Sequence, residues 1–97
     1  MLRLAEIMGA LHYVQGLCDP ANSEFWRDRM QEMLRLEKPS LEQKNALTLQ
    51  FNAGYDAAST KFSSCTDEAR TLASAKATEG EAIAQSLADA IRSESQG

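Results

Sequence analysis

The stretch from Leu47 to Cys65 constrains the fold of this 97-residue chain more than any other part of the sequence. Phe51, Tyr55 and Phe62 recur within it at helical spacing, no proline interrupts it, and one of only two cysteines ends it. Side chains that recur at steps of three and four residues lie on one face of a helix. We therefore expect a helix here, with two preceding helices folding towards it and one following helix covering it.

The first part of the chain predicts two helices separated by a proline. Apolar side chains recur at three- and four-residue steps from Leu2 to about Leu17. The segment 18–23 breaks this pattern, because an aspartate followed by a proline suits the start of a new helix. A second helix then continues to about Glu37, with Trp26 on its inward face. We interpret its charged opposite face as solvated rather than as a basic patch.

The second part of the chain contains two clear helix starts. Pro39 stops the preceding helix, and the sequence Ser40–Gln43 matches a capping box, in which serine and glutamine bond each other's backbone N–H groups. The third helix should end between Phe62 and Ser64. Thr66 followed by two acidic residues then predicts the start of a fourth helix, which carries a long stripe of small and aliphatic side chains.

These four helices predict the fold class. Short connections between helices favour antiparallel neighbours, so we expect an all-α, four-helix up-down-up-down bundle. A chain of this length is one domain. We place that domain at residues 1–92 and expect a frayed C-terminal tail over 93–97.

The bundle topology also bears on the two cysteines, Cys18 and Cys65. The first and third helices end at the same side of the bundle, which brings both thiols there, although the third helix is longer than the second and must tilt or bend. A disulfide is therefore favoured, and two unpaired thiols are the alternative. A metal site lacks ligands because His12 is the only histidine, and no Cys-x-x-Cys motif indicates a redox-active pair. A disulfide would place the protein outside the reducing cytosol.

Composition excludes several partners. The formal net charge is −4 and no run of basic residues occurs, so binding to a nucleic-acid backbone is not expected. No apolar run approaches the roughly 20 residues that span a bilayer. Glu6, His12 and Gln15 interrupt the apolar N-terminal segment, and no signal-peptide cleavage site follows, so we expect a structural helix there. We expect no cofactor and no metal.

Four residues are candidates for a binding site: His12, Tyr13, Asn52 and Tyr55. A hydrogen-bonded structural role is favoured for His12 over catalysis, and core packing is favoured for Tyr13 over a partner surface. An asparagine within a helix either faces solvent or satisfies a buried partner, and for Asn52 we favour a buried network over a ligand contact. The alternative is a ligand pocket between the first and third helices, where Gly9 lies near these side chains.

The sequence contains no constellation that indicates an enzyme. No phosphate-binding loop, zinc-helix motif or serine elbow occurs, and His12 has no evident catalytic partner in the sequence. We therefore expect a protein without catalytic activity.

Four short elements together resemble a known family. They are Leu11-His12-Tyr13 running to Leu17-Cys18, Trp26-Arg27 with Met30, Phe51-Asn52 with Gly54-Tyr55, and Phe62 followed by Cys65-Thr66. In order and spacing they resemble a family of small exported proteins of unknown function found in alphaproteobacteria. The resemblance implies a periplasmic protein with Cys18 and Cys65 bonded, although this sequence shows no signal peptide. The family carries no established activity, so no catalytic residue is transferred.

These observations lead to one expected function and one alternative. We expect a periplasmic helical binding or accessory module, in envelope maintenance, whose partner is another envelope protein. The alternative is a small-ligand carrier with its pocket between the first and third helices.

Overall fold

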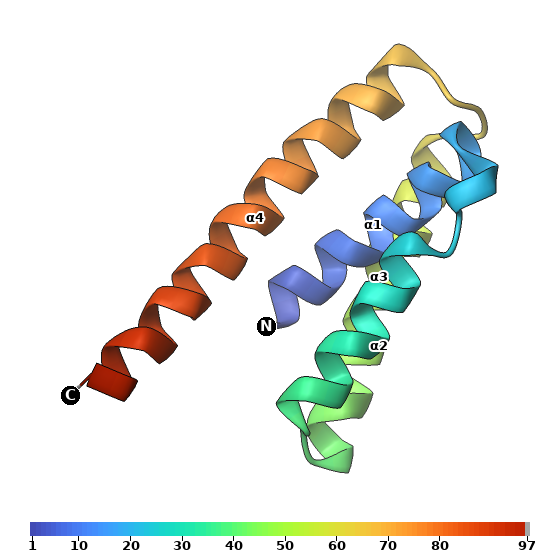
Figure 1. Cartoon of the computed structure of the whole chain (residues 1–97). Coiled ribbons are helices and arrows are strands. Elements are labelled where there is room, and N and C mark those ends of the chain that lie inside the picture. The colour runs from blue at the N-terminus through green and yellow to red at the C-terminus, as the bar shows by residue number, and fades with distance from the viewer. Residues whose placement is uncertain (97) are drawn as a thin grey trace.

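The computed structural model describes residues 1–96 and places them in four α-helices and one short 3-10 helix (Figure 1). The elements are α1 (Leu2–Cys18), η1 (Pro20–Asn22), α2 (Phe25–Glu37), α3 (Leu41–Lys61) and α4 (Asp67–Gln96). The predicted all-α, four-helix fold is confirmed. Helix α4 includes residues 93–96, and Gly97 lies outside the described residues, so the fraying expected over 93–97 stays a prediction.

The capping signals of α3 and α4 act where the sequence predicted them, whereas the start expected at residues 18–23 gives only η1, and α2 begins at Phe25 without a side-chain cap. The Gln43 backbone N–H donates to the Ser40 hydroxyl at 3.2 Å, and the Ser40 backbone N–H donates to the Gln43 side chain at 3.0 Å. This reciprocal pair is the capping box of α3. The Thr66 hydroxyl accepts from the Ala69 backbone N–H at 3.1 Å and so caps α4.

Helix α1 is the centre of the molecule, because α2, α3 and α4 all pack against it. The expectation that residues 47–65 hold this position was wrong. The physical reason is that α1 buries side chains around most of its circumference, whereas α3 buries only one line of residues. The buried residues of α1 are Ala5, Ile7, Met8, Gly9, Ala10, Leu11 and Val14.

Two glycines allow α1 and α3 to approach closely. A Cβ atom at Gly9 would overlap the carbonyl oxygen of Phe51, and a Cβ atom at Gly54 would overlap the carbonyl oxygen of Glu6. The two backbones therefore meet at two points along the crossing. The sequence interpretation that favoured tight packing at Gly9 agrees with this geometry.

Helix α4 covers α1 and not α3, which corrects the expected packing of the last helix. It lies along α1 and diverges from α2 (Figure 1). At 1.5 Å per residue, its 30 residues span about 45 Å, against about 26 Å for the 17 residues of α1. The C-terminal part of α4 therefore extends past the N-terminus of α1.

The predicted disulfide between Cys18 and Cys65 is present, with their Cα atoms 5.1 Å apart. It joins the end of α1 to the link between α3 and α4. The difference in length between α2 and α3 is partly taken up by the link of residues 19–24, which runs towards α2 from the end of α1 (Figure 1). At the same end of the bundle, the Tyr13 hydroxyl donates a hydrogen bond to the carbonyl oxygen of Phe62.

Candidate functional site

Three of the four candidate residues form one aromatic cluster between α1 and α3. The His12 ring lies 5.7 Å from that of Phe51 and 5.5 Å from that of Tyr55, measured between centroids. The Tyr13 ring meets Tyr55 edge to face at 5.2 Å. Such tilted and T-shaped contacts are the favourable geometries for aromatic rings, so the cluster contributes to packing between the two helices.

The polar atoms of this cluster differ in their hydrogen bonding. The Tyr13 hydroxyl donates a hydrogen bond to the carbonyl oxygen of Phe62. The Nδ1 atom of His12 is buried and has no hydrogen-bond partner among the described residues, so the expected hydrogen-bonded role is not found at this atom. Aromatic rings flank the imidazole, which leaves a packed histidine as the structural role.

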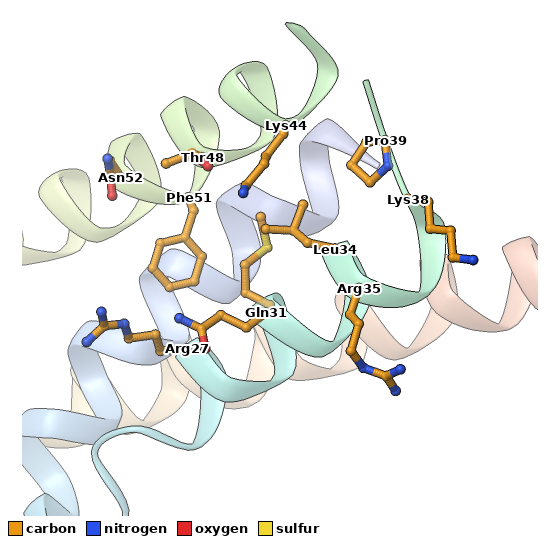
Figure 2. Close-up of a pocket in the computed structure, with 11 residues that line it drawn as sticks. Arg27, Gln31, Leu34, Arg35, Lys38, Pro39, Lys44, Thr48, Phe51 and Asn52 are labelled. Carbon is orange, nitrogen blue, oxygen red and sulfur yellow. The ribbon is translucent and has the colours of Figure 1, made fainter. Parts of the chain in front are cut away.

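Asn52, the fourth candidate residue, lies outside this aromatic cluster. Its side chain is exposed and lines a groove between α2 and α3, so the buried network favoured from the sequence is not formed. The groove has a volume of about 710 Å³, and Figure 2 shows the side chains that line it. Its lining consists of Arg27, Met30, Gln31, Leu34, Arg35, Lys38, Pro39, Lys44, Thr48, Phe51 and Asn52. We call it the α2–α3 groove.

The floor of the α2–α3 groove is apolar. Met30 is 5% exposed and belongs to the hydrophobic core, and Leu34 and Phe51 pack against that core while part of each remains accessible. Pro39 lies at the turn that joins the two helices. The core of the protein is therefore accessible from solvent at this place.

The rim of the α2–α3 groove is positively charged. Four of the ten basic residues of the chain line it, and none of the fourteen acidic residues does. Two of these cations form ion pairs with acidic residues that do not line the groove. Arg27 pairs with Glu24 at 3.4 Å, and Arg35 pairs with Glu32 at 2.7 Å. The hydrogen bonds from Arg35, more than its charge, lower the pKa of Glu32 below the ordinary value.

The other two cations, Lys38 and Lys44, form no ion pair within residues 1–96. In Figure 2, the Lys44 side chain extends from α3 towards Leu34 over the groove, and Arg27 lies at the far end beyond Phe51. Figure 2 also shows the Arg35 and Lys38 side chains extending away from the floor, so Lys44 is the cation without an ion pair that lies over it. A cation over an apolar floor is suited to a ligand that carries both negative charge and apolar surface.

The sequence interpretation missed this site because its cations come from two helices. A signal was present in the spacing, however. Arg27, Gln31, Arg35 and Lys38 follow one another at steps of four, four and three residues, which places them along one face of α2 and its C-terminal end. Acidic residues at 24, 28 and 32 recur at steps of four along the neighbouring face of the same helix. The charged side of the helix was therefore interpreted as a mixed, solvated surface.

A second groove is lined by residues of α1, α2 and α4 and has a different character. It measures about 410 Å³ and is lined mainly by apolar residues, with one cation, Arg29, and one anion, Glu81. Its charges balance, so it offers no preference for a charged ligand. The lining of the α2–α3 groove is thus more positively charged than that of this second groove.

Within residues 1–96, no helix combines the length and the apolarity that crossing a membrane requires. The same part of the chain contains no group of three His, Cys, Asp or Glu side chains arranged to hold a metal ion.

The fold and these surfaces define a small all-α protein, closed by one disulfide and carrying a basic groove between two helices. More particularly, the chain belongs to the family described as "Protein of unknown function (DUF2385)", whose model matches residues 1–91. No curated protein and no solved structure shows significant similarity to it. Membership of a family of unknown function is confirmed, while restriction of that family to exported alphaproteobacterial proteins stays a prediction.

Proposed function

We propose that this protein is a periplasmic binding or accessory module, without catalytic activity, that acts on another envelope protein in envelope maintenance. The observation that carries the proposal is the disulfide between Cys18 and Cys65. Disulfides persist in oxidising compartments and are rare in the reducing cytosol. The bond joins the end of α1 to the link between α3 and α4, 47 residues apart in the sequence, as expected for a structural disulfide in a small exported domain.

A binding role is supported by the α2–α3 groove, and a catalytic role has no comparable support. The polar side chains in this groove are cations, amides and one hydroxyl. Acid–base or nucleophilic chemistry would require a base aimed at a nucleophile, and the only histidine is packed between aromatic rings of α1 and α3.

The compartment is tested by trapping thiols in intact cells of the native host with a permeant alkylating agent. After fractionation, reduction and a second label, we expect both cysteines to be oxidised in the periplasmic fraction. Reduced cysteines in the cytosolic fraction would contradict the proposal.

The binding role is tested by a photo-crosslinking amino acid placed at Asn52, on the groove, and at Ser74, an exposed position on α4. We expect a defined crosslink to one envelope protein from position 52 and none from position 74. Equal, diffuse crosslinking from both positions would argue against a specific partner at this face.

A small-ligand carrier is the second candidate, and the volume of the α2–α3 groove favours it. Ligand sites in helical bundles lie between helices and measure roughly 300–1,000 Å³, and this groove measures about 710 Å³. The site differs from the location expected from the sequence. At Gly9 and Gly54 the backbones of α1 and α3 occupy the space between these helices, and only Asn52 of the four candidates lines the groove.

A further inference from the structure

We propose that the α2–α3 groove binds an anionic amphiphile, namely a single acyl chain that carries a carboxylate or phosphate head group. The inference rests on the carrier function proposed above and names the class of ligand. It is carried by the combination of an accessible apolar floor and a rim in which every charged side chain is basic.

The floor suits an acyl chain. Met30, Leu34 and Phe51 form a continuous part of the hydrophobic core or pack directly on it, so an alkyl chain laid across them would extend the core. Apolar surface removed from water in this way drives binding in proportion to its area. Helix α2 is only 13 residues long, and the turn at Pro39 bounds one end of the groove. At 1.5 Å per residue, the 13 residues of α2 span about 20 Å, a length along which an extended acyl chain can lie.

The rim suits an anionic head group. The protein as a whole carries a net charge of −4 and repels anions, yet the lining of this groove includes four cations and no acidic residue. Lys44, whose side chain lies over the groove in Figure 2, forms no ion pair within the described chain, so an anion bound to it would not have to displace an existing carboxylate. A local positive field of this kind selects ligands by the sign of their charge.

The position of Lys44 is not explained by helix stability. Lys44 is the fourth residue of α3, close to the positive end of the helix dipole, where a cation is unfavourable. At the C-terminal end of α2, by contrast, the helix dipole favours the positive charge of Lys38. Lys44 therefore lies where local structure would favour another residue, at the groove. A role for its side chain in binding accounts for this position.

Titration of the purified, oxidised full-length protein tests the proposal. The probes are dodecanoate and dodecyl phosphate, compared with neutral dodecanol and cationic dodecyltrimethylammonium, all below the concentrations at which they aggregate. Calorimetry measures affinity, and amide chemical shifts map the site. We expect both anions to bind and to shift residues 27–52, with dodecanol at least tenfold weaker and the cation without binding at this site.

Three variants sharpen the test. Lys44→Glu should weaken dodecanoate at least tenfold, because it reverses the charge over the groove. Thr48→Trp should abolish binding of every probe, because it fills the groove from an exposed position without removing a core side chain. Lys61→Glu makes the same change in net charge outside the groove and should leave affinity within twofold of the original protein. A circular dichroism melt confirms that each variant is folded.

Several outcomes would overturn the proposal. They are equal affinity for dodecanol and dodecanoate, unchanged binding in Lys44→Glu, or chemical shifts that map to another surface. Failure of every amphiphile, together with a specific protein crosslink from position 52, would also reject it, because the groove would then hold a protein segment. In that case the protein-binding module proposed first would stand, and the carrier function would be rejected together with its ligand.

Discussion

At the scale of single residues, two glycines set the distance between α1 and α3. A side chain at Gly9 or Gly54 would overlap a backbone carbonyl group of the opposite helix, and a backbone cannot move aside as a flexible side chain can. Gly16 lies on the same helix as Gly9 but has no atom within 4 Å of the position a Cβ would take. One helix therefore provides both a sensitive position and its control.

The Gly9→Ala substitution should lower the free energy of unfolding by about 2 kcal/mol or more, because the added methyl group forces the two backbones apart. Gly16→Ala should instead raise it by about 0.5–1 kcal/mol, since alanine is the better helix former. Urea denaturation followed by circular dichroism measures both. Equal effects at the two positions would show that helix propensity, and not the close approach of α1 and α3, decides the outcome.

A single ion-pair network joins the start of α1 to the middle of α4. The Arg3 guanidinium donates two hydrogen bonds to Glu79, at 2.7 and 2.9 Å, and a third to Glu6 at 2.9 Å. These hydrogen bonds are the main reason that the pKa of Glu79 lies below the ordinary glutamate value of 4.5. The pair is largely exposed, so its contribution to stability is reduced by solvent and by salt.

This network predicts a pH dependence of stability. Because folding lowers the pKa of Glu79, the contribution is complete above pH 4.5 and is lost as the pH falls below that value towards the lowered pKa. The free energy of unfolding of the original protein should therefore fall more steeply on acidification than that of Glu79→Gln. Urea denaturation between pH 3 and pH 7 measures this. Glu81→Gln, a nearby exposed change outside any described ion pair, should keep the original slope.

At the scale of secondary-structure elements, the boundaries of the helices come from local chemistry. The capping box at the start of α3 satisfies backbone N–H groups that have no partner within the helix. It also fixes where α3 begins relative to the turn at Pro39, and hence where Lys44, Thr48 and Phe51 lie along the α2–α3 groove.

The Ser40→Ala substitution should cost about 1 kcal/mol of stability, because it removes the acceptor for the Gln43 backbone N–H. Amide hydrogen exchange should increase first in residues 41–44, the turn that loses its cap. Ser63→Ala, in the exposed link after α3, should change neither quantity. No loss of protection in that turn would mean that packing on α1, rather than the cap, holds the start of α3.

At the scale of the whole molecule, α1 holds the structure together and the disulfide closes it. The three other helices pack on α1, while the pairs among them make few contacts. Because the outer helices make few contacts with one another, the fold depends strongly on links that hold the ends of its helices together. The bond from Cys18 to Cys65, 47 residues apart, restrains the two helices that contain most of the core.

Replacing both cysteines by serine should lower the free energy of unfolding by about 4 kcal/mol, the value that loop-closure entropy assigns to a separation of this length. A typical domain has only about 5–15 kcal/mol in total, so the variant should be marginally folded. Urea denaturation of the oxidised protein, the reduced protein and the double variant measures this. Equal midpoints for all three would show that the bond does not restrain the unfolded chain.

The starts of α3 and α4, the fold class and the pairing of the cysteines could be predicted from the amino-acid sequence, whereas the start of α2 at Phe25 could not. Caps and prolines act within a few residues, and short links between four helices leave few topologies, so Cys18 and Cys65 come to the same end. Only the tertiary structure decided that α1 is central, that α4 covers α1, and that Asn52 is exposed. It also decided that Lys44 joins the cations of α2 around one groove. These features depend on which helix faces meet across long sequence separations, where packing outweighs any local preference.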